Sequence, residues 1–146
     1  MVADETASGF QPEIVLLYCR QALAPGTRPA QGLRAGQGFK AKLVVLPCSS
    51  KMEVPHLLRI LEQGADAVQV LACPPKTCRF LVGNNRAEKR MAYARGLLEQ
   101  VGMEPERLAL ERGSGLDLEG LMELAGRRAE LVGKMGPNPM KGDNRQ

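Results

Sequence analysis

The sequence contains no tryptophan, a single histidine and only 3% aromatic residues, and it has no long hydrophobic run. The scarcity of aromatic side chains argues against nucleic-acid binding, in which bases commonly stack on aromatic rings. One histidine, with no Ser/His/Asp pattern, excludes a hydrolytic triad. Apolar runs such as 43–46 and 67–72 fall far short of the roughly 20 residues that a membrane-spanning helix requires. We therefore expect neither a nucleic-acid partner nor a membrane span.

The amino-terminal residues carry the acids Asp4 and Glu5 where a signal peptide would have a basic region, and no apolar segment of that kind follows them. We therefore expect a cytoplasmic protein, a setting in which structural disulfides are rare. The chain of 146 residues has 20 Lys and Arg, 16 Asp and Glu, and a net charge of +4. This length is enough for one domain with its own core. The four cysteines are therefore not needed to hold the fold together.

Short apolar segments recur along the chain between stretches of other character. They are rich in Val, Ile and Leu and lack polar alternation, which is typical of strands covered on both faces of a sheet. These predicted strands are 14–18, 42–46, 67–72 and a weaker 108–110.

Three intervening segments have helical periodicity. One begins near Pro55 and is capped by Gly64, and the last runs over about 117–132. The middle one begins at Asn85 in a capping-box-like start and ends at Gly102, with an apolar stripe formed by Ala87, Met91, Ala94, Leu98 and Val101. The glycine-rich segment 21–40 is expected to be mostly loop, with at most a short helix.

The order of these elements predicts an α/β fold. We expect a single domain with a small parallel sheet of about four strands, flanked by helices and joined by right-handed crossovers. This arrangement is Rossmann-like or flavodoxin-like. The domain should span 13–132, and the polar ends 1–12 and 133–146 are predicted to be flexible tails.

The four cysteines lie at related places in this scheme. Cys19 follows the first strand, Cys48 follows the second, Cys73 ends the third, and Cys78 lies in the loop beyond it. Because parallel strands place their carboxyl ends at one edge of the sheet, these thiols should converge there. Each cysteine also has a basic residue near it in sequence that would offset thiolate charge, namely Arg20, Lys51, Lys76 or Arg79.

Four converging thiolates can hold a structural zinc ion or an iron–sulfur cluster. Zinc sites usually have cysteines paired about two to four residues apart, whereas here only Cys73 and Cys78 are close in sequence. The spacing therefore favours a cluster. The alternative is that the cysteines are buried as small apolar side chains.

The segment from Cys73 to Arg79 also has the spacing of a phosphatase loop. Such a loop binds phosphate through successive backbone N–H groups, and Pro74 and Pro75 have none. A Cys73-dependent phosphatase or arsenate reductase-like enzyme is therefore the weaker alternative.

Several segments resemble, in order, the landmarks of one known family. They are Gly64 to Val68, the Cys73 and Cys78 pair, Gly83 to Arg90, and Gly102 to Leu108. Over roughly 13–112 the chain resembles the delta subunit of methyl-viologen-reducing hydrogenase, a small iron–sulfur protein that links an electron donor to heterodisulfide reductase. Ala22 stands where this family typically has a further cysteine, and Arg20 and Gln21 replace its Asn-Trp pair.

The resemblance implies a 2Fe-2S cluster with Cys19, Cys48, Cys73 and Cys78 as ligands. It also implies a hetero-oligomer, in which this chain relays electrons between a donor module and a flavin-containing heterodisulfide reductase A-like subunit. The donor would be a hydrogenase, a formate dehydrogenase or a similar module. We expect no catalytic residues in the chain, since it offers no general base, nucleophile or substrate-pocket signature. The main alternative is a zinc-stabilised structural subunit of a redox complex.

Overall fold

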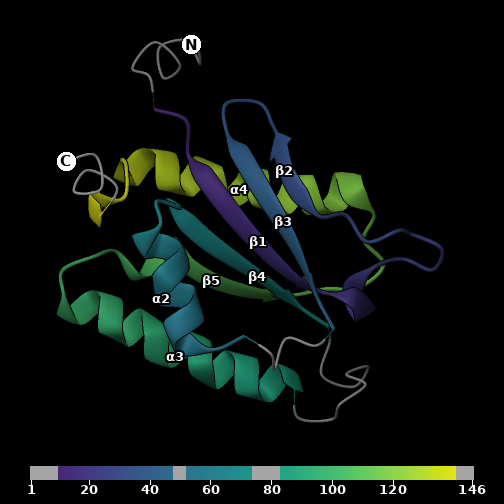
Figure 1. The fold of residues 1–146 in the computed structure, drawn as a ribbon, viewed down its shortest axis with the longest axis horizontal. Coiled ribbons are helices and arrows are strands. Elements are labelled where there is room, and N and C mark those ends of the chain that lie inside the picture. The colour runs from purple at the N-terminus through teal and green to yellow at the C-terminus, as the bar shows by residue number, and fades with distance from the viewer. Residues whose placement is uncertain (1–9, 48–51, 74–82, 141–146) are drawn as a thin grey trace.

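The computed structural model describes residues 10–47, 52–73 and 83–140. These residues form one sheet of five strands in the order β2-β3-β1-β4-β5 (Figure 1). The strands are β1 (Glu13–Cys19), β2 (Gly32–Ala35), β3 (Lys40–Leu46), β4 (Ala67–Ala72) and β5 (Leu108–Arg112). β1 pairs in parallel with β3 and β4, and β4 pairs in parallel with β5. The predicted α/β class and parallel sheet are confirmed.

The predicted count of about four strands was one too low, because β2 lies within the segment predicted as loop. β2 pairs antiparallel with β3 at the edge of the sheet. Three of its four residues are exposed, so it lacks the buried apolar pattern by which a strand is recognised in sequence. The segment was expected to hold at most a short helix, and a single 3-10 turn at Arg20–Ala22 overlaps its start.

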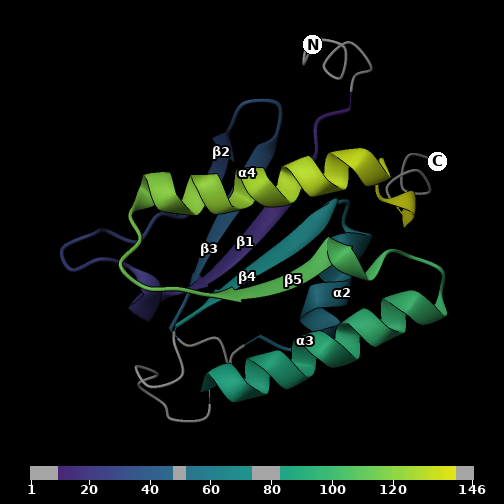
Figure 2. The same ribbon diagram turned by 180° about the vertical axis from the view of Figure 1, so that it is seen from behind.

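Helices cover both faces of the sheet. They are α2 (Val54–Glu62), α3 (Gly83–Gln100) and α4 (Leu118–Met135). Figures 1 and 2 show α4 on one face and both α2 and α3 on the other. Two apolar clusters correspond to these faces: one joins α4 to residues such as Leu16 and Leu43, and the other joins α2 and α3 to residues such as Leu17 and Val70. No helix in the described part of the chain has the length and apolar character needed to cross a membrane.

The helix termini follow the predicted caps at α2 and α4. Gly64 has φ of +115° and its N–H donates to the carbonyl of Leu61 at 3.1 Å, which suits a glycine after a helix. The carboxylate of Asp117 accepts from the N–H of Gly120 at 2.9 Å at the start of α4, as an N-cap residue does.

Two details of α3 were predicted wrongly. The helix begins at Gly83, so Asn85 lies in its first turn and is not its N-cap. Val101 is 68% exposed, whereas the other stripe residues Ala87, Met91, Ala94 and Leu98 are buried. The helix ends at Gln100, so Val101 lies in the turn that follows it, where the helical period no longer directs a side chain to the core.

A buried polar network lies where β1 and β4 begin. The carboxylate of Asp66 accepts from the N–H of Glu13 at 2.8 Å and from the N–H of Asn138 at 2.9 Å. The side-chain amide of Asn138 donates to the carbonyls of Leu61 at 2.8 Å and Ala65 at 2.7 Å. Asp66 and Asn138 are 0% and 1% exposed, so each polar group depends on these partners instead of water.

Arg107 attaches the end of α4 to this network. Its guanidinium donates to the carbonyls of Asp66, Gly136 and Pro137 at 3.0, 2.9 and 3.2 Å. α4 also continues three residues beyond Val132, and Asn138 is buried. Part of the range 133–146 that was expected to be a tail is therefore packed on the domain.

Tyr18 connects β1 to the segment that leads to β2. Its hydroxyl donates to the carbonyl of Ala30 at 2.5 Å, and its side chain is 0% exposed. Burial raises the pKa of Tyr18 above its ordinary value, against the opposing effect of this hydrogen bond and of the cations Arg20 and Arg34. The neutral phenol is therefore the form that the fold favours.

Candidate functional site

The carboxyl edge of the sheet brings Cys19 and Cys73 together. Cys19 is the last residue of β1, Cys73 directly follows β4, and these strands are parallel neighbours in which Tyr18 lies opposite Leu71. Both cysteines are 1% exposed, and they form a buried cluster of their own, separate from the two main apolar clusters. The sequence-based expectation that these two thiols converge is therefore met.

The other two predicted ligands, Cys48 and Cys78, lie outside the described residues. β3 ends at Leu46, which pairs with Cys19, and Pro47 is the last described residue before Cys48. Residues 74–82, which include Cys78 and most of the alternative phosphatase loop, separate Cys73 from the start of α3. Within the described ranges, no three His, Cys, Asp or Glu side chains are grouped as a metal site would need.

The backbone after β1 is held in place by hydrogen bonds that reach the start of α4. Cys19 has extended dihedrals, φ −73° and ψ 133°, and the 3-10 turn follows it directly. The carbonyl of Ala22 accepts from the N–H of Leu116 at 3.1 Å, and the N–H of Ala24 donates to the carbonyl of Leu116 at 2.8 Å. Ala22 is buried in the α4-side cluster. The position where the resembling family has a further cysteine therefore packs into the apolar core and not with Cys19 and Cys73.

Arg112 is a basic residue at this edge that the sequence pattern did not reveal. It ends β5 opposite Ala72, and its Nη1 donates to the carbonyl of Cys73 at 3.4 Å. Its Nη2 lies 2.7 Å from a carboxylate oxygen of Glu88 on α3. The predicted fourth strand ends at residue 110, whereas β5 continues to Arg112, which therefore reaches the carboxyl edge. Extending the parallel register by two residues would have found it.

Only one of the four cations that were expected beside the thiols, Arg20, lies in the described part of the chain. Arg20 is exposed, and Lys51, Lys76 and Arg79 lie outside the described residues. Among the described residues, Arg112 is the basic side chain with a hydrogen bond to the backbone of a cysteine. A positive charge near a thiolate favours the ionised form and offsets the charge of any metal centre bound there.

The donor chemistry of the described part of the site suits a soft metal centre. Two thiols meet in a buried setting, and thiolate sulfur is the usual ligand of zinc and iron–sulfur centres. Burial also excludes water, and the nearby guanidinium provides compensating charge. The residues present therefore fit an iron–sulfur centre or a zinc ion, provided that further ligands come from outside the described ranges.

Comparison with known proteins gives a consistent result over nearly the whole chain. The family model described as methyl-viologen-reducing hydrogenase, delta subunit, matches residues 14–136. The D-type iron-sulfur subunit of the vhu F420-non-reducing hydrogenase from Methanococcus maripaludis is 31% identical over 131 residues, covering 90% of this chain and 98% of that protein. The D-type iron-sulfur subunit of an F420-non-reducing hydrogenase from Archaeoglobus profundus is 31% identical over 128 residues, covering 88% and 93%.

A second kind of relative matches only a part of the chain. The A-type subunit of the ferredoxin:CoB-CoM heterodisulfide reductase from Methanosarcina mazei is 34% identical over 61 residues. This match covers 42% of the present chain and 8% of that protein.

Proposed function

Because the chain belongs to the methyl-viologen-reducing hydrogenase delta subunit family, we propose that it is an electron-transfer subunit whose iron–sulfur cluster lies at the carboxyl edge of the sheet. The observation that carries the proposal is the contact between the buried Cys19 and Cys73 at the ends of neighbouring parallel strands. The names of the relatives, which describe iron-sulfur subunits of hydrogenases, support the choice of cofactor.

The proposed cofactor is a 2Fe-2S cluster held by Cys19, Cys48, Cys73 and Cys78. Four thiolates are the ligand set of such a cluster, and the chain has four cysteines in all. The pairing of Cys19 with Leu46 supports a position for Cys48 close to the same edge. When bound, the cluster supplies one-electron redox chemistry. Zinc is the alternative occupant of the same thiols.

The described residues would serve this cofactor in three ways. Cys19 and Cys73 would bind it from two strands whose spacing is set by the sheet. The burial of both side chains would keep water from the sulfurs, which influences the reduction potential. Arg112 would favour the more negative, reduced state through its positive charge, and its ion pair with Glu88 would moderate that effect.

The proposed partners are a donor module and a flavin-containing heterodisulfide reductase A-like subunit, in a cytoplasmic hetero-oligomer. The names of the relatives support a hydrogenase as the donor, and a formate dehydrogenase or similar module is the other candidate. The 61-residue similarity to a heterodisulfide reductase of the A type supports the second partner. No substrate chemistry is assigned to the chain itself.

The test uses the anaerobically purified complex that contains the full chain. Hydrogen and formate are supplied in separate experiments, and the visible absorption is followed before and after addition of an oxidised acceptor. We expect one donor to bleach the absorption of this protein, and the acceptor to restore it. In a complex that carries Cys73→Ala, the chain should remain assembled. The part of the absorption decrease that comes from this chain should be absent. Unchanged bleaching in that variant would refute the proposal.

A further inference from the structure

One face of the sheet is only partly covered by helices. On the side of α2 and α3, α2 packs against β4 and α3 packs against β5 (Figure 1). Between β1 and β3, where a parallel crossover usually supplies a helix, the chain forms only the 3-10 turn and strand β2. Within the described part of the chain, no helix lies over β2 or the beginning of β3 on this side, whereas Val44 and Leu46 near the end of β3 join the cluster of α2 and α3. Leu33 of β2 is accordingly 72% exposed.

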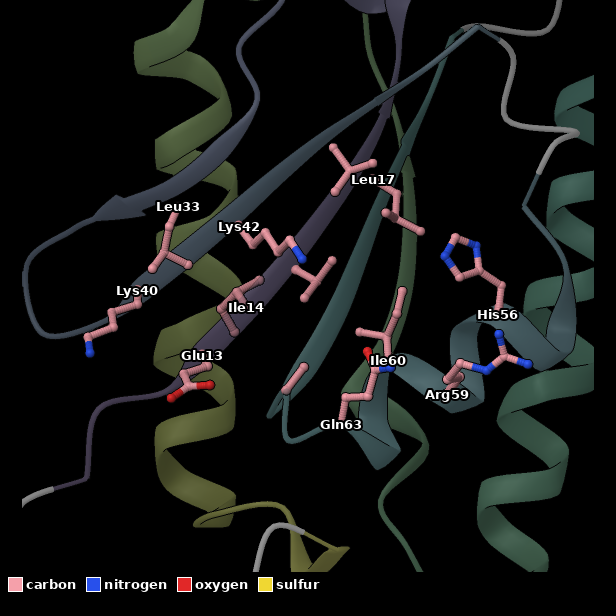
Figure 3. A pocket seen from close by; sticks show the side chains of 13 residues that line it. Glu13, Ile14, Leu17, Leu33, Lys40, Lys42, His56, Arg59, Ile60 and Gln63 are labelled. Carbon is pink, nitrogen blue, oxygen red and sulfur yellow. The ribbon is translucent and has the colours of Figure 1, made fainter. Parts of the chain in front are cut away.

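A groove of about 470 Å³ occupies this uncovered place beside α2. Its apolar lining comes from the sheet and from one side of α2, and includes Val15, Leu17, Val44, Ile60 and Leu33. Figure 3 shows Leu33 and the strands on one side of the space, and His56, Arg59 and Gln63 projecting from α2 on the other. The groove therefore takes the position that a covering helix would occupy in an α/β sheet.

Three cations line the groove together with its apolar residues. Lys40 and Lys42 alternate along β3 with the side chain of Ala41, which is buried on the opposite face, and Arg59 faces them from α2. All three side chains are exposed, and none of them forms an ion pair with a carboxylate in the described ranges. Glu13 is the one acidic residue among those that line the groove. An apolar floor with unpaired positive charge favours an acidic, amphipathic partner.

We propose that this groove binds an acidic amphipathic helix of a partner protein in the complex, which completes the helical layer over β3. The apolar side of that helix would cover Leu33, Val44 and Ile60, and its carboxylates would meet Lys40, Lys42 and Arg59. A helix is about 10–12 Å wide with its side chains, and α/β sheets normally carry helices at this place. The inference rests on the proposed function only because that function supplies a partner protein.

Two other occupants agree less well with the structure. The amino-terminal segment of the chain carries Asp4 and Glu5, but Phe10 packs against the α4-side cluster, so the chain reaches β1 from the opposite face of the sheet. A second copy of the protein would bring the same three cations to a symmetric contact, and like charges placed together oppose association.

The first test is photo-cross-linking in the purified complex, with p-benzoylphenylalanine in place of Leu33. The control carries it in place of Leu131, which is 45% exposed on α4. We expect position 33 to cross-link to a partner peptide that is net acidic and has apolar residues at helical spacing, and position 131 not to reach that peptide. The proposal is overturned by a cross-link from position 33 to residues 1–9, to a second copy or to a basic peptide, and equally by no cross-link.

The second test is charge reversal, which separates this inference from the proposed function. We expect Lys40→Glu with Lys42→Glu to weaken binding to the partner protein about tenfold at low salt, and less at high salt. The control pair, Arg127→Glu with Lys134→Glu on α4, should bind as the unchanged chain does. Iron and sulfide content should be the same in all three proteins. If the two double variants bind the partner protein equally well, the groove proposal is overturned. If none of the three proteins contains iron, the proposed function is refuted instead.

Discussion

Cys19 and Cys73 contact each other across two neighbouring parallel strands, β1 and β4, at the edge where both strands end. Neither side chain belongs to the apolar clusters that hold the helices to the sheet. Their contact is therefore a local feature of the carboxyl edge. A metal centre bound there would depend on both thiols, and it would depend little on the residues that stabilise the core.

The first prediction concerns these two thiols. Cys19→Ala and Cys73→Ala should each lose most of the iron and sulfide of the anaerobically prepared protein, since each removes one ligand of a four-thiolate site. Their far-ultraviolet circular dichroism should stay close to that of the unchanged chain. A full cluster with an unchanged spectrum in Cys19→Ala would contradict the assignment of that residue.

The second prediction concerns the place where the family typically has a further cysteine. Ala22 is buried in the α4-side cluster, away from the Cys19 and Cys73 contact. The double variant Cys19→Ala with Ala22→Cys should therefore bind no more iron than Cys19→Ala alone. Recovery of iron in the double variant would show that a thiol at position 22 reaches the site.

The third prediction concerns the charges beside Cys73. Arg112→Gln should lower the midpoint potential by on the order of tens of millivolts, because it removes a positive charge that favours the reduced cluster. Glu88→Gln should raise the potential, since it removes the carboxylate paired with Arg112 at 2.7 Å. A redox titration of both variants measures the two midpoint potentials, which should shift in opposite directions. Shifts in the same direction, or none, would mean that Arg112 does not act through its charge.

The fourth prediction concerns the buried amide of Asn138. Asn138→Ala should lower the free energy of unfolding by about 2–4 kcal/mol, because it leaves the carbonyls of Leu61 and Ala65 without a donor in a buried place. The neighbouring and exposed Pro139→Ala serves as the control and should change stability little. Urea unfolding gives both values. Equal stability of the two variants would show that the side-chain amide of Asn138 does not stabilise the fold.

The fifth prediction concerns pH. Burial raises the pKa of Tyr18, so its stabilising contribution is complete below its ordinary pKa of 10.0 and is lost as pH rises through the higher folded pKa. Tyr18→Phe should cost about 1–2 kcal/mol at neutral pH, because the carbonyl of Ala30 loses its donor. The difference between the two proteins should shrink above pH 10. Tyr93→Phe, at a side chain that is 63% exposed, should change stability little at neutral pH.

The parts of the fold that follow from local sequence pattern were predictable. β1, β3 and β4 are wholly or largely apolar and agree with the predicted strands within two residues at each end, because buried strands carry their signal in their own side chains. The convergence of Cys19 and Cys73 followed from that pattern, since parallel strands have their carboxyl ends at one edge.

The parts that depend on pairing between distant segments have little or no signal in their own residues, and of these only Arg112 could have been reached, by extending the parallel register of β5. β2 is a strand because β3 offers it hydrogen bonds, and its own exposed residues give no sign of this. Arg112 reaches Cys73 because β5 extends to the edge beside β4. Asn138 is buried because Asp66, Leu61 and Ala65 offer it partners far away in the chain. In each case tertiary contacts override a polar or weak local pattern.

The central claim is that the cysteines at the carboxyl edge hold a 2Fe-2S cluster. Its most direct test is a determination of iron, acid-labile sulfide and zinc in the full chain, purified anaerobically with its partner proteins and then separated from them. The account predicts about two iron and two sulfide per chain, with a visible absorption band and no stoichiometric zinc. A colourless protein with one zinc and no sulfide would contradict it.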